Sequence, residues 1–521
     1  MADVARRLSV SSGSPPSLLL RMARQYDSKG QMEEAIGTYQ VVIRSADEQG
    51  DPVVLAEALR RLAVARHRRQ ERSEAHALCE RSYQVALDQG DTALTVEALN
   101  TLAGFELVEE NYEVARNIFS RALSVQSVHP ELRGRIEQNL GTVQSIQGDH
   151  AGALAHYQRS LDAFTAAGND PGRAIAYHNL GVVNAERKVW DEADRCFRLS
   201  LKIVEQTGDR HLHGLGVLNH AEVLAALGKL KEARIAAESA VCIFDELRAP
   251  AELSDAYRML GMVCREAGEF ALARTRLRLA VEFASASGSA MSEAEALREL
   301  AYLNARTGCI DEALDLLVRA TSGLSRLKPC MRHAEMVAGI YPVAVANWGD
   351  LVRSVDLPTF EHMERVAAHA VLVAKALGCD ESAQARVRVG AYLHDVGKLR
   401  IPRSLLSKTE PLTNEELAVH HRHPLCSAEL LAPVQLPWDV TAMIRGHQER
   451  LDGSGYPLGL HGDQIPLEAR IIGIVDHYDS LTGTARPQGA PSKAEILGDL
   501  ESLRRWWGSE VCEAFYHSLA A

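Results

Sequence analysis

The chain has 521 residues, of which 46% are hydrophobic, 24% charged and only 5% aromatic. This composition is that of a globular protein, and the low aromatic content favours helices packed through Ala and Leu over a sheet. Lys and Arg number 57 against 69 Asp and Glu, a net charge of −12, which argues against a broad surface for nucleic acid or anionic lipid. Nine scattered cysteines and the lack of a long apolar run predict a reduced, cytoplasmic protein that binds neither DNA nor a membrane.

The first three-fifths of the chain repeats with a period close to 40 residues, after a flexible leader expected at residues 1–15. An alanine recurs in eight units, and Gly stands five residues before it in five of them. Such a unit is typical of two amphipathic helices, the first of which ends in a left-handed Gly. One hairpin cannot bury its apolar face alone, so the units must stack. The recurring alanines are Ala35, Ala75, Ala115, Ala153, Ala193, Ala233, Ala273 and Ala313.

Pairs such as Leu140-Gly141, the Gly, the repeat Ala and a following aromatic such as Phe197 resemble the tetratricopeptide repeat. The resemblance implies an α-solenoid of about eight helical hairpins over residues 16–325. Repeats of this kind usually bind a protein or peptide partner in a concave groove. A spacer or dimerisation scaffold is the alternative, which makes a homodimer a further expected assembly. His156 and His178 are expected to be ordinary surface or packing residues of these helices.

Histidines gather in the last two-fifths of the chain, beyond a linker expected at residues 326–358 with a helix from Met331 onward. Nine of the chain's 20 histidines fall between His362 and His477. His394-Asp395 closes an apolar stretch, and Lys398 follows within one helical turn. Imidazole combined with carboxylate suits iron, manganese, zinc or nickel better than calcium. This part of the chain therefore predicts a transition-metal site.

Further motifs follow in order: His423-Pro424, the segment 449–457 with Gly455-Tyr456-Pro457, and an apolar helix at 469–479 that ends in acids. Together with His394-Asp395 they resemble the HD-GYP family, a branch of the HD metal-dependent phosphohydrolases, over about residues 355–517. The resemblance implies an all-helical HD-type metal domain at residues 359–521. The expected fold class of the whole chain is therefore all-α.

The resemblance also assigns the site residues. Two divalent metal ions are expected, iron or manganese first and zinc or nickel as alternatives, with Asp395 bridging them. The predicted metal ligands are His362, His394, Asp395, His423, His447 and Asp476. Asp395 and Lys398 are the predicted catalytic residues, and the predicted substrate-binding residues are Arg450, Gly455, Tyr456, Pro457 and Arg486.

The activity that the resemblance implies is hydrolysis of cyclic di-GMP, or a related 3′,3′ cyclic dinucleotide, to a linear dinucleotide or GMP. The repeats would regulate or localise this phosphodiesterase. The alternative is a sensor that binds the cyclic dinucleotide without cutting it and signals through the repeats. Two departures from the family pattern favour that alternative: Gln448 replaces a histidine, and the segment after Arg486 lacks a Tyr and a second Arg.

The other histidines of this region are not expected to bind metal. His369 is interpreted as a core or surface residue, His420 and His421 as exposed helix residues, and His461 and His477 as surface residues. A third metal ion is not expected, because Pro358 stands where family members with three metals have a Glu.

Overall fold

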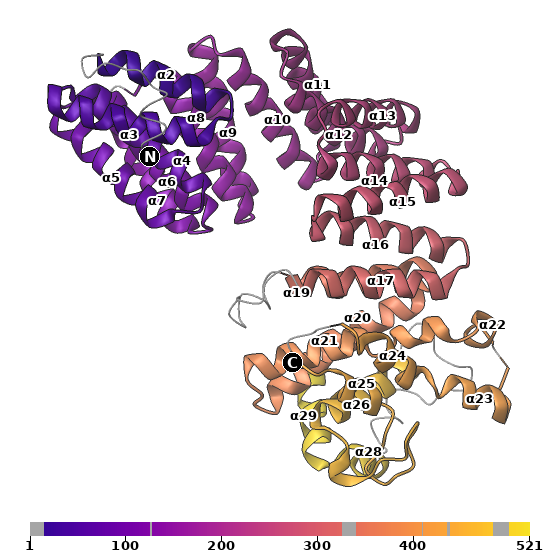
Figure 1. Ribbon diagram of the computed structural model, residues 1–521. Helices are drawn as coiled ribbons and strands as arrows, with labels where there is room; N and C mark the ends of the chain where they lie inside the picture. The colour runs from indigo at the N-terminus through magenta and orange to yellow at the C-terminus, as the bar shows by residue number, and fades with distance from the viewer. Residues whose placement is uncertain are drawn as a thin grey trace. The chain divides into compact units, whose positions relative to one another are not determined.

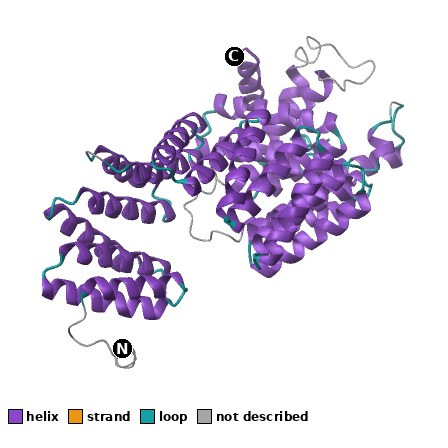
Figure 2. Cartoon of the chain, turned by 90° about the horizontal axis from the view of Figure 1, so that it is seen from above, coloured by secondary structure: helices purple, strands orange, loops and turns teal. Residues whose placement is uncertain are grey.

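The computed structural model describes residues 15–125, 128–325, 340–408, 410–434, 438–482 and 500–520. Every regular element in these ranges is a helix (Figure 2), which confirms the predicted all-α class. None of the described helices has the length and apolar character that crossing a membrane requires. The leader expected at 1–15, apart from Pro15, and the stretch 326–339 of the expected linker lie outside the described residues.

The chain divides into two compact units, Met1–Ser239 and Ala240–Ala521. The division falls inside a repeat helix, so the second unit holds the last repeats as well as the histidine-rich region. The predicted domain boundaries near 325 and 358 stay predictions.

Sixteen helices between Pro16 and Ser325 follow one another as eight pairs among the described residues (Figure 1), as the period of 40 predicts. The first six pairs are α2 (Pro16–Ser28) with α3 (Met32–Gln49), α4 (Pro52–Arg68) with α5 (Arg72–Asp88), α6 (Thr92–Val108) with α7 (Tyr112–Ser124), α8 (Pro130–Ile146) with α9 (His150–Ala166), α10 (Asp170–Glu186) with α11 (Trp190–Thr207), and α12 (Arg210–Ala226) with α13 (Leu230–Glu246). The last two pairs are α14 (Pro250–Glu266) with α15 (Phe270–Ser287), and α16 (Ala290–Arg306) with α17 (Ile310–Ser325).

Close approach within a pair explains the small residues of the repeat. A Cβ atom added to Gly181 on α10 would lie 2.8 Å from the ring of Phe197 on α11, so only Gly lets these two helices pack so tightly. The predicted turn also holds, since Gly148 adopts φ of +78° after α8. His178 is buried beside Phe197 and His156 pairs with Glu137, so both are packing residues as expected.

The rest of the second unit consists of helices of varied length, from a single turn to the 20 residues of α20. They are α19 (Ile340–Val355), α20 (Leu357–Ala376), α21 (Glu381–Leu393), the 3-10 helix η1 (Val396–Arg400), α22 (Arg403–Leu406), α23 (Asn414–His420), α24 (His423–Leu431), α25 (Thr441–Gly446), the 3-10 helix η2 (Gly462–Gln464), α26 (Leu467–Thr482), α28 (Leu500–Trp507) and α29 (Ser509–Ala520).

The last repeat and these helices share one hydrophobic core. Leu314 and Leu317 of α17 belong to the same buried cluster as Trp348 of α19 and Val396 of η1. All four side chains are at most 1% exposed. Removing the repeats at residue 325 would therefore open the core of the region that carries the metal-ligand motifs.

We expect Leu317→Ala to destabilise that region although the residue lies in a repeat. Loss of a buried leucine costs about 2–5 kcal/mol when the cavity cannot collapse. The measurement is urea unfolding followed by tryptophan fluorescence, which reports mainly on this region because four of the five tryptophans lie at residue 348 or beyond. Leu59→Ala, at an equally buried site of the first unit, is the control and should leave this transition unchanged. Equal effects of both variants would contradict a shared core.

Candidate metal centre

Four histidine rings converge with Nε2 toward one point because neighbouring acceptors hold their other nitrogen. In His394, His423 and His447, Nδ1 lies 2.6–2.8 Å from the backbone carbonyl of the residue three positions earlier. A carbonyl oxygen can only accept, so Nδ1 carries the proton in each ring. The Nε2 lone pair is therefore free to bind a metal, as in most protein metal sites.

One group of ligand atoms comes from three segments. His362 on α20 has Nε2 2.9 Å from Asp476 Oδ1 on α26 and 3.6 Å from Asp395 Oδ2. His394, at the end of α21, has Nε2 3.3 Å from Asp395 Oδ2. The ligand atoms of His362, His394 and Asp476 all lie within 4.8 Å of one another. This is the spacing of groups that can share one ion.

A second group forms around the other oxygen of the same carboxylate. His423 Nε2, at the start of α24, lies 3.3 Å from Asp395 Oδ1 and 3.4 Å from His447 Nε2. His447 follows α25 directly. Asp395 Oδ1 therefore faces His423, whereas Oδ2 faces His362 and His394. The ligand atoms of His394, Asp395 and His447 also lie within 4.8 Å of one another, so a carboxylate that bridges two ions fits this arrangement.

The ligand atoms of this centre are arranged for binding metal ions, because several of them have no hydrogen-bond partner in the part of the chain that the structure describes. His394 Nε2 and Asp395 Oδ1 are buried and have no hydrogen-bond partner among the described residues. Unpaired buried polar atoms are rare and costly in folded proteins. The ligand atoms are four imidazole nitrogens and two carboxylates, a set that suits divalent transition metals. The six predicted metal ligands are thus brought together, each of them buried.

Burial and charge set the protonation of the centre. Burial lowers the pKa of His447 to about 4 and the pKa of His423 well below its usual range, so both rings stay neutral and ready to bind metal. Burial would raise the pKa of Asp395, but His394 and Lys398 outweigh it and lower the pKa instead. Lys398 Nζ lies 2.5 Å from Asp395 Oδ2, and the acids nearby outweigh burial and raise the pKa of Lys398.

Asp479 is a positioning residue that the sequence analysis missed. Its Oδ2 lies 2.7 Å from His362 Nδ1, and both of its oxygens accept hydrogen bonds of 2.9 Å from Arg365. Asp479 fixes the ring of His362 in the same way that the carbonyls fix the other three. Burial would lower the pKa of His362, but Asp476 and Asp479 outweigh it and raise that pKa to about 9.

The segment after Asp395 lies directly against α24. A Cβ atom on Gly397 would come within 2.3 Å of the His423 carbonyl oxygen, so a larger residue cannot stand there. Ser427 ties the two segments together, because its hydroxyl donates to the carbonyl of His394 at 2.7 Å and accepts from the amide of Gly397 at 2.8 Å. This contact holds the ligands His394 and His423 in a fixed relation.

Gln448 takes a hydrogen-bonding role at the position where the family has a second histidine. Its Nε2 donates to Asp476 Oδ2 at 2.6 Å. Gln448 thereby holds Oδ2 of Asp476, while Oδ1 of the same carboxylate faces His362. Gln448 therefore orients a metal ligand in this structure.

A buried carboxylate shapes the loop that carries Gly455-Tyr456-Pro457. Glu449 is 1% exposed and accepts hydrogen bonds from the backbone amides of Leu458 at 2.6 Å and Leu460 at 3.0 Å. Gly455 lies so close to the preceding turn that an added Cβ would come within 2.5 Å of backbone atoms. The sequence analysis gave Glu449 no role, because only the folded loop shows where its oxygens point.

Tyr456 stacks on His421, with ring centroids 3.7 Å apart and planes 7° apart. His420 lines the same cavity as Tyr456. The prediction that His420 and His421 are exposed is therefore wrong: both are half-buried, because the loop covers this face of the short helix α23. Pro457 follows in the same loop and is half-buried.

Arg450 lies over the ring of Trp506, with 3.8 Å from its guanidinium carbon to the ring centroid. His477 packs against Trp506 and Trp507 and is half-buried, so its prediction as a surface residue is wrong. His461 is exposed, as expected. His369 lies half-buried beside Phe515 and Ser518, consistent with a packing role. Arg486, the remaining predicted substrate-binding residue, lies outside the described residues.

A cavity of about 1020 Å³ opens over the metal centre. Its walls include the ligands His362, His423 and Asp476 together with Lys398 and Tyr456. This volume is at the upper end of the range for small-molecule sites. Ligand donors, one ammonium group and aromatic side chains thus face one open space.

Comparisons with known proteins agree with this architecture. Residues 349–511 match the HD domain family, and residues 18–53, 94–166 and 132–206 match tetratricopeptide repeats. The cyclic di-GMP phosphodiesterase response regulator RpfG of Xanthomonas campestris is 46% identical over 134 residues, which cover 25% of this chain and 35% of that protein. A cyclic di-GMP phosphodiesterase of Thermotoga maritima is 34% identical over 164 residues, 31% of this chain and 44% of that protein.

A 3′3′-cGAMP-specific phosphodiesterase of Vibrio cholerae is 32% identical over 157 residues, 30% of this chain and 34% of that protein. The chain thus spans less than half the length of each of these relatives. The matches confirm both resemblances drawn from the sequence. Residues 349–511 thus match an HD domain similar to that of these phosphodiesterases, and they follow a region that matches tetratricopeptide repeats.

Proposed function

We propose that the chain hydrolyses a 3′,3′ cyclic dinucleotide, with cyclic di-GMP as the first candidate. The observation that carries the proposal is the buried carboxylate of Asp395, whose two oxygens face different histidines, His394 at Oδ2 and His423 at Oδ1. Relatives that match the HD domain are phosphodiesterases for cyclic di-GMP or 3′3′-cGAMP. Hydrolysis adds water across one phosphodiester P–O bond and opens the ring to a linear dinucleotide, and a second cut would release mononucleotides.

Two divalent ions, iron or manganese before zinc or nickel, would be held by His362, His394, Asp476, His423 and His447 around Asp395, and would supply Lewis-acid stabilisation and an activated water. The chain itself supplies further groups. Lys398 keeps its charge inside the cavity, because nearby acids raise its pKa, and it can donate to a phosphate oxygen as negative charge builds up. Burial raises the pKa of Tyr456, so its hydroxyl stays protonated as a donor.

A net charge of −12 does not oppose a dinucleotide substrate, because the local field of a metal centre dominates at short range. The repeats would place the enzyme on a protein or peptide partner, or pair two copies of the chain. One observation favours the sensor alternative: Gln448 donates a hydrogen bond to Asp476 where the family has a histidine, which leaves the centre with one nitrogen ligand fewer.

The decisive variant is Asp395→Ala, which removes both oxygens that face the two histidine sets. We expect the purified variant to hold little metal and to lose at least about 1000-fold in turnover, since the bridging group and the metal chemistry go together. Metal analysis and chromatography of cyclic di-GMP products measure the two effects. Asp463→Ala removes an exposed carboxylate of the same region and should change neither. Unchanged turnover in Asp395→Ala would refute the proposal, and tight binding without product in the unaltered protein would favour the sensor.

Gln448→His tests whether this position limits metal retention. A histidine there restores the family pattern and adds a nitrogen donor beside His447, so we expect about 10-fold tighter metal retention, within the range by which groups around a site tune affinity. Competition with a chelator measures the change. Gln158→His adds a histidine to the exposed face of α9 and controls for adventitious binding. If both variants release metal at the same chelator concentration, Gln448 does not limit the centre.

Glu449→Ala should disturb the loop that carries Tyr456 without affecting metal binding. Two backbone amides would lose an ionised acceptor, and such hydrogen bonds contribute about 1.5–3 kcal/mol each. We expect KM for the cyclic dinucleotide to rise while metal content stays constant, because Tyr456 loses its fixed place on His421. Glu449→Gln keeps one acceptor oxygen, so its KM should lie between those of the unaltered protein and Glu449→Ala. Glu513→Ala, which removes an exposed glutamate of α29, should have the KM of the unaltered protein. Loss of metal in Glu449→Ala would contradict this role.

A further inference from the structure

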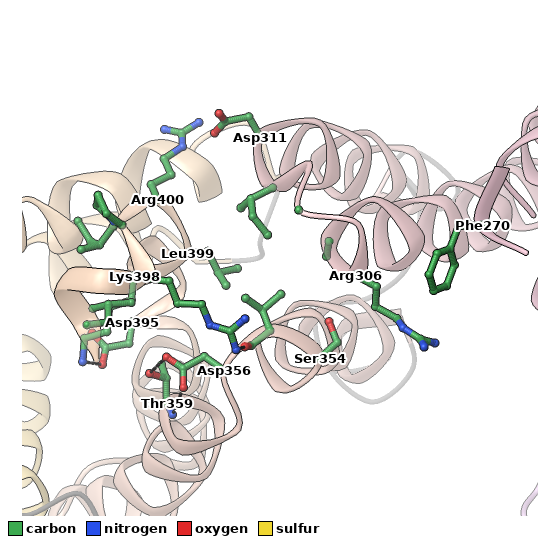
Figure 3. A pocket seen from close by; sticks show the side chains of 18 residues that line it. Phe270, Arg306, Asp311, Ser354, Asp356, Thr359, Asp395, Lys398, Leu399 and Arg400 are labelled. Carbon is green, nitrogen blue, oxygen red and sulfur yellow. Dashed lines mark hydrogen bonds and ion pairs between the residues drawn. The ribbon is translucent and has the colours of Figure 1, made fainter. Parts of the chain in front are cut away.

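A second cavity, of about 600 Å³, lies inside the second compact unit between the last repeat and the HD domain. Its walls come from the turn between α16 and α17, the end of α19 and the helix η1 (Figure 3). Asp311 of the repeat and Arg400 of the HD domain lie at one rim, and Arg306 and Phe270 lie on the repeat side. The volume is in the range of small-molecule sites.

This cavity reaches the metal centre. Asp395 and Lys398 both line it, and Lys398 also lines the cavity over the metal ligands. Asp356, Thr359 and Arg403 are likewise common to the two cavities. Any ligand that fills the two cavities together therefore passes the predicted bridging carboxylate.

The walls carry the chemistry that nucleotides need. Phe270 is 37% exposed, and the guanidinium carbon of Arg306 lies 5.6 Å from its ring centroid. An exposed aromatic ring beside a guanidinium plane is a surface on which a base can stack. On the HD side, Arg400 and Arg403 line the cavity and offer guanidinium donors for phosphate oxygens.

We propose that this cavity receives the second nucleotide of the cyclic dinucleotide, so that the last two repeats form part of the substrate site. The inference rests on the proposed function. A cyclic dinucleotide has one nucleoside on each side of a phosphate. If one phosphate lies beside the metal centre around Asp395, its two nucleosides extend in different directions from that point. Two cavities that meet at Lys398 match this shape.

The last repeat packs directly against the HD domain, so a movement of this repeat would change the shape of the second cavity. Its side chains share the core of the HD domain, and Ser322 of α17 donates a hydrogen bond of 3.1 Å to the carbonyl of Pro433. A shift of α17 therefore moves one wall of the cavity while the metal ligands stay on their own helices. Such a shift changes substrate affinity more than chemistry.

The test uses Phe270→Ala and Arg306→Ala in the full chain, with cyclic di-GMP and bis(p-nitrophenyl) phosphate as substrates. Loss of one stacking partner should raise KM for cyclic di-GMP about 10-fold and leave kcat within about 2-fold, since stacking on a base is worth this much in affinity. Turnover of bis(p-nitrophenyl) phosphate, which has no nucleoside, and the metal content should not change. Arg278→Ala, an exposed arginine of α15 outside the cavity lining, is the matched control.

The outcomes separate the two proposals. If the unaltered protein hydrolyses neither substrate, the proposed function fails. If it hydrolyses cyclic di-GMP and both variants retain its KM, the substrate site does not extend to the repeat and this inference is overturned. An unchanged KM combined with loss of a response to added GMP would also overturn it, by making the cavity an effector site. A selective rise in KM in both variants supports the inference.

Discussion

The buried carboxylate of Asp395 is the constraint around which the HD domain is built. Its side chain is 1% exposed, and an isolated carboxylate at such a depth costs several kcal/mol in lost hydration. Lys398 offsets part of this cost at 2.5 Å. His394, His423 and His447 present Nε2 lone pairs, which cannot donate a hydrogen bond to Asp395. Metal ions between the carboxylate and the imidazoles would satisfy both at once. In that case the groups that supply the chemistry would also stabilise the domain, since metal binding is coupled to folding.

The repeats could be predicted almost completely, because each helix pair contacts only its neighbours and every contact recurs at a fixed sequence distance. Gly181 and Phe197, 16 residues apart, are one such contact. The metal ligands are far apart in sequence, from His362 to Asp476, and periodicity could not bring them together. Their motifs were found through the family resemblance, and the structure places all six predicted ligands in one centre.

What the sequence did not disclose are the residues that act through a ligand. Arg365 lies three residues after His362 and Asp479 three after Asp476, so each lies one turn along a ligand helix. That spacing was a usable signal for the pair that holds the His362 ring. Glu449 and His421 gave no such signal, because their burial depends on a loop that folds back over them. The exposure of a residue on a seven-residue helix cannot be read from the helix alone.

The common core of the last repeat and the HD domain changes what the repeats can do. A repeat array on a flexible linker would move the enzyme without altering it. Here Leu314 and Leu317 fill the same core as Val396, which follows Asp395 in the chain. Packed cores resist continuous deformation and pass displacements to their neighbours. A displacement of α17 would therefore reach η1 through direct packing, because Leu314, Leu317 and Val396 share one core.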